Sequence, residues 1–358
     1  MIVMKFGGTS VKDSGAVARL ISIVGKKPLQ KTIVVVSALA GVTDTLTHMA
    51  KLASVGKSEE AIGLSSGLEA RHLIMAEELL AGSTALLSET SNIVIQHFAK
   101  LNELIRVISV LGELSDMSMA KILSYGELLS SSIIFRAMLQ SGLKCAFADA
   151  RNIIVTDSCY LKGEPQIEAI RNRVQELMKK EINVNDVVIT QGFISATADG
   201  TVTTLGRGGA DYTAALIGMA ADATEIQIWT DVDGVHTTDP RKVDKTRSIP
   251  VMSFSEAAEL SFFGAKVLHP STIQPAVEKN IPVRVLNSMH PDRQGTFILR
   301  DDEVRENGVR AISFKENITV INVFSMKMLN AFGFLTRLFE VFGKYGTSVD
   351  LISTSEVN

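Results

Sequence analysis

The hydrophobic positions follow two alternating patterns along the first 300 residues of the chain. Short runs of β-branched and other apolar residues, typical of strands that are covered on both faces, occur at 2–6, 32–37, 144–149, 187–191, 225–230, 282–286 and 296–299. Between these runs, apolar residues repeat every three or four positions, which predicts helices at 13–24, across 43–140, and at 166–180, 212–221 and 256–263. This alternation predicts an α/β fold, a three-layer αβα sandwich around a mostly parallel sheet.

The residues after 300 follow a different pattern. A charged stretch at 301–307 predicts a linker, and an expected strand at 318–324, an amphipathic helix at 332–345 and a strand at 348–353 come after it. Such a βαβ unit has too few strands to form a stable sheet by itself. We therefore expect a domain boundary near residue 300 and a C-terminal segment that either pairs with another copy or belongs to a longer protein.

Three glycines within four positions mark the stretch 204–212, where Gly206, Gly208 and Gly209 surround Arg207. Glycine lets the backbone approach a ligand closely, and the start of the helix that follows carries partial positive charge. Arg207 adds a planar fork that binds a carboxylate or a phosphate through two hydrogen bonds. The stretch is therefore a candidate anion site. Asp211 within it is either a helix cap in an ordinary tight turn or a residue that orients a reacting group or a metal.

A second glycine turn, residues 7–10, follows the first expected strand and precedes a helix, which is again the layout of an anion site. Lys5, at the end of that strand, is either a solvated side chain or a point charge for phosphate. The strand at 32–37 likewise ends in small residues, from Ser37 to Thr43, at the edge where open α/β sheets bind their ligands.

Glu127 lies among glycine, leucine and serine residues on a helix whose pattern indicates burial. A buried carboxylate is unusual unless it has a partner. The sequence therefore predicts either a buried ion pair or a carboxylate that binds an ammonium group.

Composition narrows the classes of function. The 358 residues are 46% hydrophobic, and their formal net charge of −3 argues against a nucleic-acid binder, which needs a basic surface. No apolar run reaches the roughly 18–20 residues that span a bilayer, and the N-terminus does not resemble a signal peptide, so we expect a cytoplasmic protein without a membrane partner. Cys145 and Cys159 fit a reducing compartment and lack metal-type spacing.

Seven motifs occur in order: KFGGTS at 5–10, SALAGVT at 37–43, GE at 126–127, TLGRGGADY at 204–212, WTDVDG at 229–234, TDPR at 238–241 and FGAKVLHP at 263–270. Together they resemble the motifs of the aspartate kinase family. The tail resembles the start of the ACT regulatory region of that family, and the chain looks most like its lysine-sensitive, single-function branch.

The resemblance implies an amino-acid kinase fold, like that of carbamate kinase, over residues 1–300. The N-terminal part of this domain would bind aspartate and the C-terminal part nucleotide, and residues 301–358 would form a linker and the beginning of an incomplete ACT domain. It implies transfer of phosphate from ATP, with Mg²⁺, to the β-carboxylate of L-aspartate, the first step of lysine, threonine and methionine biosynthesis.

The resemblance also implies roles for single positions. Catalytic roles fall to Lys5, Asp211 and Lys266. Aspartate would be bound by Thr43, Glu127 and Arg207, with Glu127 at its ammonium group and Arg207 at its α-carboxylate. The nucleotide-binding positions are Lys5, Gly7, Gly8, Ser37, Thr230, Asp231, His236, Arg241, Lys266 and Val267. His236 stands where the family commonly has a tyrosine, and no residue is identified as a certain ligand of Mg²⁺.

ACT regions of this family dimerise and bind an end-product amino acid, often lysine. The resemblance therefore implies a homodimer and a lysine effector. The matching effector positions are Met328, Ser348, Val349, Asp350 and Ser355, for which ordinary packing is the alternative interpretation.

Two other functions stay open on sequence grounds. One is a non-catalytic amino-acid sensor on a kinase scaffold, which the joint presence of Lys5, Asp211 and Lys266 disfavours. The other is a sister kinase of the same fold that acts on another acid.

Overall fold

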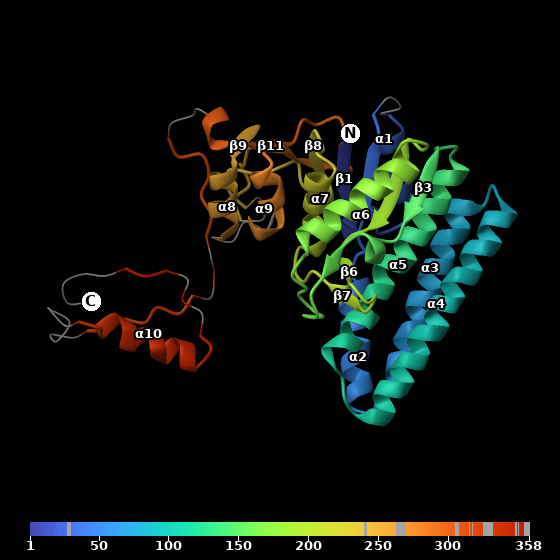
Figure 1. Cartoon of the computed structure of the whole chain (residues 1–358), viewed down its shortest axis with the longest axis horizontal. Helices are drawn as coiled ribbons and strands as arrows, with labels where there is room; N and C mark the ends of the chain where they lie inside the picture. The colour runs from blue at the N-terminus through green and yellow to red at the C-terminus, as the bar shows by residue number, and fades with distance from the viewer. Residues whose placement is uncertain are drawn as a thin grey trace. The chain divides into compact units, whose positions relative to one another are not determined.

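The computed structural model describes residues 1–26, 30–239, 242–262, 270–304, 308–314, 316, 318–324, 332–347, 349 and 351–353. The chain divides into two compact units, Met1–Phe314 and Lys315–Asn358, which are described separately below. The first unit is built on an eight-stranded sheet with the order β3-β5-β2-β1-β8-β10-β11-β9 (Figure 1). A smaller sheet has the order β4-β6-β7.

The strands are β1 (Ile2–Phe6), β2 (Thr32–Val36), β3 (Cys145–Ala148), β4 (Val155–Thr156), β5 (Val187–Gln191), β6 (Ile194–Thr197), β7 (Val202–Thr204), β8 (Glu225–Thr230), β9 (Val251–Ser253), β10 (Val283–Asn287) and β11 (Thr296–Leu299). The helices are α1 (Ser14–Gly25), α2 (Val42–Ser54), α3 (Ser58–Leu80), α4 (Thr84–Leu111), α5 (Asp116–Gln140), α6 (Ile167–Leu177), α7 (Gly209–Ala220), α8 (Phe254–Phe262), α9 (Pro270–Glu278) and α10 (Phe334–Lys344). Short helical turns are η1 (Gly8–Val11), η2 (Ala150–Asn152), η3 (Met178–Ile182) and η4 (Asp301–Glu303).

The large sheet is mostly parallel, as the sequence predicts. Every pair of neighbouring strands in it is parallel except β10 and β11. The seven apolar runs of the sequence each coincide with one of its strands to within a residue at either end, and the eighth strand, β9, was not anticipated. It is only three residues long, too short for its own hydrophobic pattern to identify it.

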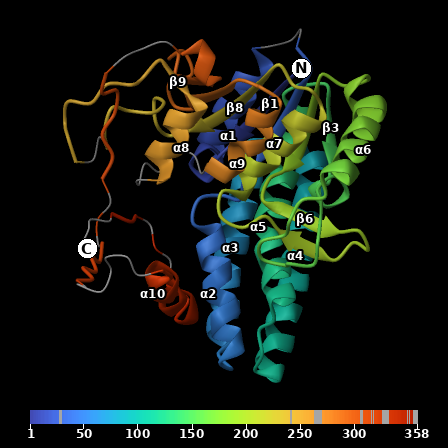
Figure 2. The same cartoon turned by 60° about the vertical axis from the view of Figure 1, so that its left-hand side comes forward.

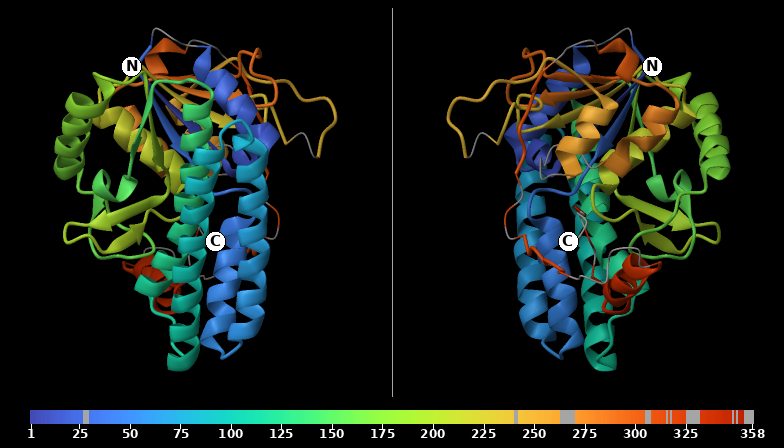
Figure 3. Two further views of the ribbon diagram at one scale, coloured as in Figure 1. Left: turned by 90° about the vertical axis from the view of Figure 1, so that its right-hand side faces the viewer. Right: turned by 90° about the vertical axis from the view of Figure 1, so that its left-hand side faces the viewer.

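Helices cover both faces of this sheet, which gives the three predicted layers (Figure 3). Alternate side chains of a strand point to opposite faces. In β1, Met4 and Phe6 pack against the layer of α1 to α5, and Val3 packs against the layer of α6 to α9. Lys5 is two residues after Val3 and lies on the same face of the strand, so its side chain projects toward the layer that contains α7.

Helix α5 is the one helix among the described residues that is long and apolar enough to cross a membrane. Its apolar stretch is 78% buried within the protein. Its apolarity is therefore accounted for by its place between the sheet and the helices α2 to α4, which it contacts.

The carboxyl ends of the central strands lie at one edge of the sheet, on the side where α2 to α5 extend past it (Figure 2). The register places the last residue of β1, Phe6, beside Val36 of β2 and beside Trp229 of β8. Val36 is in turn beside Gln191, the last residue of β5. The loops that leave these four strands therefore start side by side.

The second unit contains α10, within the helix expected at 332–345. The flanking strands expected at 318–324 and 348–353 are not formed in the described residues of those ranges. A strand needs a neighbour for its backbone hydrogen bonds, and these stretches do not pair. The assignment of this unit to an ACT domain stays a prediction.

We expect Gly192→Ala to lower the free energy of unfolding by about 1–3 kcal/mol, because the new methyl group would overpack a filled site. A Cβ at Gly192 would lie 2.5 Å from Cβ of Ala210 in the first turn of α7. Urea unfolding followed by the fluorescence of Trp229, the only tryptophan, measures this effect. Gly63→Ala is the control, since a Cβ there meets nothing within 4 Å and should stabilise α3 by up to about 1 kcal/mol. Equal midpoints for both variants would contradict the close contact between β5 and α7.

Candidate active site at the carboxyl ends of the strands

An ion pair joins the first strand to α7. Nζ of Lys5 lies 2.6 Å from Oδ1 of Asp211, and the two side chains are only 11% and 15% exposed. Such a shielded pair is weakly screened by salt. Asp211 thus holds the ammonium group of Lys5 at the strand end, and the interpretation of Asp211 as a helix cap is wrong. The N-cap of α7 is Gly208, without a side-chain cap.

The turn after β1 approaches the segment after β2 closely. A Cβ at Gly8 would lie 3.1 Å from the carbonyl oxygen of Ala38, and the carbonyl oxygen of Gly8 accepts from the N–H of Ala40 at 3.2 Å. Gly8 begins the helical turn η1, so its own N–H has no acceptor inside that turn. The N–H of Gly7 donates to the carbonyl of Trp229 at 3.1 Å. The N–H of Gly7 is therefore already engaged within the protein, and the N–H of Gly8 is the one left to donate to a ligand.

Two serines that the sequence analysis missed as a pair tie the same turn to β8 and β10. The hydroxyl oxygens of Ser10 and Ser288 lie 2.8 Å apart, and the Ser288 hydroxyl donates to the carbonyl of Thr230. Ser288 directly follows β10. The rule that ligands bind beyond the carboxyl ends of strands would have identified it.

The Arg207 turn has the backbone that its glycines predict. Gly208 adopts the left-handed conformation, with φ of 74°, which favours glycine. Gly209 must lack a side chain, because its Cβ would lie 2.9 Å from the ring of Phe193. Arg207 itself is exposed and has no hydrogen-bond or ion-pair partner among the described residues. Its guanidinium group is thus free to receive an anion.

Glu127 is 3% exposed and pairs with no cation in the described part of the chain, so the interpretation as a buried ion pair is wrong there. Its Oε1 accepts from the N–H of Ala38 at 3.1 Å, and its Oε2 is buried without a partner. Burial raises the pKa of this carboxyl to about 8, against the opposing effect of the Ala38 N–H. A buried carboxylate with one unmatched oxygen is suited to bind a cation.

The segment between β2 and α2 lies against α5, which carries Glu127. The hydroxyl of Ser130 donates to the carbonyl of Ser37 at 2.8 Å. A Cβ at Gly126 would lie 2.8 Å from Cβ of Ala38, so α5 can approach only because residue 126 is glycine. Thr43 stands in the first turn of α2, where N–H groups lack partners inside the helix. Glu127 and Thr43 therefore border one segment.

The loop after β8 carries three of the predicted nucleotide positions. The hydroxyl of Thr230 donates to Oδ1 of Asp231 at 3.2 Å, and Asp231 is exposed. His236 has its Nδ1 3.0 Å from the hydroxyl of Thr246 and pairs through its backbone with Ser248. Thr230 ends β8 and Asp231 follows it directly, beside the turn of Gly7. His236 is held by the segment that contains Thr246 and Ser248, which runs antiparallel to it.

Several predicted positions lie outside the described residues: Arg241, Lys266, Val267, Met328, Ser348, Asp350 and Ser355. Of the effector positions, Val349 alone is described, and it is exposed. The structure therefore gathers Lys5, Gly8, Glu127 and Asp211 around the ends of β1 and β2. The roles of all the individual residues stay predictions.

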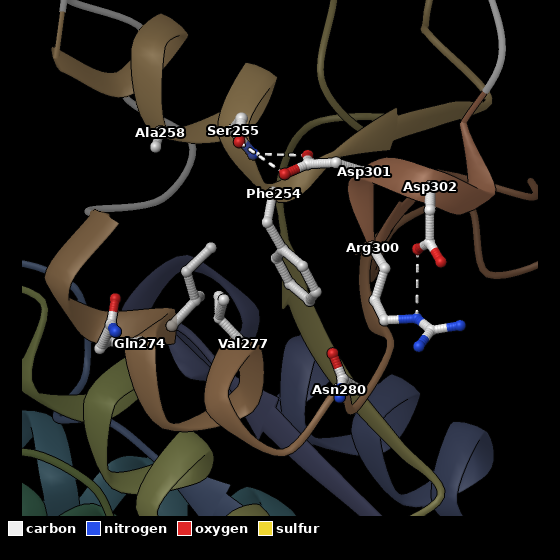
Figure 4. Close-up of a pocket in the computed structure, with 10 residues that line it drawn as sticks. Phe254, Ser255, Ala258, Gln274, Val277, Asn280, Arg300, Asp301 and Asp302 are labelled. Atoms are coloured by element: carbon white, nitrogen blue, oxygen red, sulfur yellow. Dashed lines mark hydrogen bonds and ion pairs between the residues drawn. The ribbon is translucent and has the colours of Figure 1, made fainter.

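No group of three or more His, Cys, Asp or Glu side chains suited to a metal ion occurs in the part of the chain that the structure describes. A cavity of about 560 Å³ lies between α8, α9 and η4, lined by residues such as Phe254, Val277 and Arg300 (Figure 4). On its rim, Asp301 accepts hydrogen bonds from the backbone and hydroxyl of Ser255. None of the predicted site residues that the structure describes lines this cavity.

The chain is similar to a known protein family and to several known proteins. The model of the amino acid kinase family matches residues 1–287. The chain is 36% identical over 360 residues to lysine-sensitive aspartokinase 3 of Escherichia coli (strain K12), and the match covers 100% of this chain and 77% of that protein.

Two solved structures of Escherichia coli aspartokinase III are also similar to this chain. One is a complex with lysine and aspartate in the T-state, with a TM-score of 0.81 and 32% identity. The other is a complex with aspartate and ADP in the R-state, with a TM-score of 0.80 and 32% identity. Each match covers 100% of this chain and 77% of the other chain.

We expect Glu127 to make folding less favourable as pH rises. Its folded pKa of about 8 lies above the ordinary value of 4.5, so the folded protein binds more protons between these two pH values. Stability should therefore fall from about pH 4.5 to about pH 8, and Glu127→Gln should remove this loss, on the order of 2–5 kcal/mol.

Urea unfolding at about pH 5.5 and about pH 8.5, of the wild type and of Glu127→Gln, measures the difference. Glu168→Gln is the control, because Glu168 is exposed on α6 and forms only a surface pair with Arg171. If Glu127→Gln and the wild type lose stability in parallel over this range, Glu127 is not buried in the neutral form.

Proposed function

The chain belongs to the amino acid kinase family, and to its aspartokinases, and we propose how its described residues catalyse transfer of the γ-phosphoryl group of ATP to the β-carboxylate of L-aspartate. A carboxylate oxygen of aspartate attacks the γ-phosphorus, the bond from that phosphorus to the β–γ bridging oxygen breaks, and ADP leaves. The products are 4-phospho-L-aspartate and ADP. The aspartate carboxylate is already ionised at pH 7, so the reaction needs no general base.

What the protein must overcome is the repulsion between two anions. Phosphoryl transfer depends on alignment and on neutralisation of charge, with little covalent help from the protein. Lys5 supplies a cation at the end of β1, and Asp211 keeps its ammonium group directed along the sheet edge. The N–H of Gly8 adds a backbone donor where η1 begins. We assign these three groups to the transferring phosphate.

Selection of aspartate is assigned to two ionisable side chains that have no ion-pair partner in the described residues. Glu127 has a buried carboxylate oxygen without a donor, and Arg207 has an unpaired guanidinium group. An α-amino acid carries the two complementary charges, an ammonium and an α-carboxylate. An acid that lacks either one leaves a site charge unmatched, and this penalises its binding. Thr43, in the first turn of α2, is assigned to the aspartate side chain.

Magnesium fits this arrangement as a companion of the nucleotide. Mg²⁺ keeps several water ligands and is commonly held by one or two carboxylates together with substrate phosphates. Asp211, which pairs with Lys5, and the exposed Asp231, which directly follows β8, are two described carboxylates that could hold it there. Bound Mg²⁺ would supply neutralisation of the phosphate charge.

The observation that carries the proposal is the pairing of Lys5 with Asp211 at the sheet edge where the turns after β1, β2 and β8 meet. A sensor that does not turn over has no need of a shielded lysine at that edge. The E. coli relative was solved with aspartate and ADP, the expected substrate and product.

We propose a cytoplasmic location. Two free cysteines, Cys145 and Cys159, fit the reducing conditions of the cytoplasm.

Lysine is the proposed effector. The E. coli relative is named lysine-sensitive, and its T-state structure contains lysine. We assign the effector site of this chain to the second unit, and we propose that two copies pair through it. The stretches 318–324 and 351–353 expose apolar residues such as Phe324 and Leu351, which a second copy would cover.

The proposed reaction is tested by trapping the acyl phosphate with hydroxylamine. The purified chain with ATP, MgCl₂ and L-aspartate should give the hydroxamate. Arg207→Ala should raise KM for aspartate by about 10- to 100-fold, since a hydrogen bond to a charged group contributes about 1.5–3 kcal/mol. KM for ATP should stay close to that of the wild type.

Arg171→Ala is the matched control, because Arg171 is an exposed arginine on α6 that contacts Glu168. Turnover of glutamate, acetylglutamate or a nucleoside monophosphate without turnover of aspartate would assign the chain to a sister kinase. An equal loss of ATP and aspartate affinity in Arg207→Ala would place Arg207 at the phosphates instead.

L-lysine should inhibit the same assay, with threonine and methionine as comparison ligands. Allosteric coupling typically changes affinity by about 5- to 150-fold, so the apparent KM for aspartate should rise within that range at saturating lysine. Light scattering with and without lysine reports whether the chain is a dimer. If the rate of aspartate phosphorylation does not change with lysine, the assignment of lysine as the effector of this chain is wrong.

A further inference from the structure

Arg71, on α3, connects two loops of the candidate site that the sheet alone does not fix. Its Nη1 donates to the carbonyl oxygen of Ala40 at 2.9 Å, and its Nη2 donates to the carbonyl oxygen of Lys12 at 3.0 Å. Ala40 lies in the segment between β2 and α2, and Lys12 ends the turn η1 after β1. One guanidinium group therefore holds both loops.

The two loops also contact each other, which closes a small network. The N–H of Ala40 donates to the carbonyl oxygen of Gly8 at 3.2 Å. Ala40 thus binds Gly8 through its backbone N–H and Arg71 through its carbonyl oxygen. Hydrogen bonds in which the donor is charged are about twice as strong as neutral ones. Arg71 accordingly fixes how far apart the two loops lie.

Fixing the carbonyl of Ala40 also fixes the next residue. In a trans peptide the N–H points opposite to the C=O. With the carbonyl of Ala40 on Arg71, the N–H of Gly41 is directed away from α3. Gly41 is the N-cap of α2 and has a φ of 82°, a left-handed conformation that favours glycine. The orientation of the start of α2, which carries Thr43, thus depends on the guanidinium group.

The part of α3 that carries Arg71 is held firmly in the core. The next residue on α3, His72, is fully buried, with its Nδ1 2.7 Å from the carbonyl oxygen of Leu68. Burial lowers the pKa of His72 to about 4, so its ring is neutral and packs beside that of Phe98. Helix α3 packs against both α2 and α4 in the helical layer (Figure 3). The arginine therefore extends from a fixed support.

We propose that Arg71 is a positioning residue for phosphoryl transfer: it sets the separation between the Gly8 turn, at the phosphate, and the segment before Thr43, at aspartate. This inference rests on the proposed function for the identity of the two ligands. Arginine is required because its planar fork serves two carbonyl groups at once, whereas a lysine ammonium is a single point charge.

The test is the hydroxylamine assay on the full chain with Arg71→Ala and Arg71→Lys. Misplacement of reacting groups by about 1 Å can cost about 100-fold in rate. We expect kcat of Arg71→Ala to fall about 10- to 100-fold with a smaller change in either KM, and Arg71→Lys to be intermediate. Guanidinium chloride at about 20 mM, far below denaturing concentrations, should restore part of the kcat of Arg71→Ala.

Arg136→Ala is the matched control. Arg136 is also an arginine of the helical layer, and it contacts the carbonyl of Ser132 and the carboxylate of Glu89 but neither loop. It should keep kcat and show no response to guanidinium. If Arg71→Ala does not fold, as reported by the unfolding midpoint of Trp229, an intermediate kcat of Arg71→Lys supports the proposal and an unchanged kcat overturns it.

Failure of this inference differs from failure of the proposed function. A wild type that does not phosphorylate aspartate contradicts the proposed function, and Arg71 is then measured with the acceptor that the wild type does phosphorylate. An active wild type with Arg71 variants of equal kcat, or a loss of kcat that guanidinium does not restore and that Arg136→Ala shares, would overturn the role of Arg71.

Discussion

The parallel pairing of β1 with β2 on one side and β8 on the other is the constraint on which the site depends. Because parallel strands end at the same edge, the turns after Phe6, Val36 and Thr230 emerge together although they are far apart in the sequence. The same pairing decides which face of the sheet Lys5 lies on. Its side chain projects toward α7, which carries Asp211. The shielded ion pair is a consequence of the register.

The charges at this edge are unevenly matched within the protein. Lys5 has a carboxylate partner, whereas Glu127 keeps a buried oxygen without a donor and Arg207 keeps a free guanidinium group in the described structure. Leaving a buried carboxylate unmatched is costly, and the raised pKa of Glu127 reduces that cost by keeping the group protonated. A ligand with an ammonium group would replace that proton. In the proposed function, this link between burial, protonation and recognition accounts for a carboxyl group among the buried residues of α5.

Close approach of backbones is the second requirement. Gly8, Gly126 and Gly192 each stand where a Cβ would meet a neighbouring segment at 3.1 Å or less. They allow the turn after β1, the helix α5 and the start of α7 to converge on the strand ends. Arg71 then bridges two of the converging loops from outside the sheet. Two features therefore assemble the site. Glycines at the close contacts let the backbones approach each other, and the long side chain of Arg71 connects two of the loops.

The sequence by itself determined the layers, the mostly parallel sheet and the glycine turns, because hydrophobic periodicity and backbone freedom are local properties. For Glu127 and for Asp211 the sequence allowed alternative interpretations, because a sequence does not show whether a charged side chain has a partner. The tertiary structure shows their partners: Asp211 meets Lys5 across more than 200 residues of chain, and among the described residues Glu127 meets a backbone N–H and no cation. It also shows that the N–H of Gly7 is engaged by Trp229, that Ser288 lies beside Ser10, and that Arg71 contacts the loops after β1 and β2. These contacts join residues far apart in sequence, so only the packing of strands and helices, which no local pattern records, brings them together.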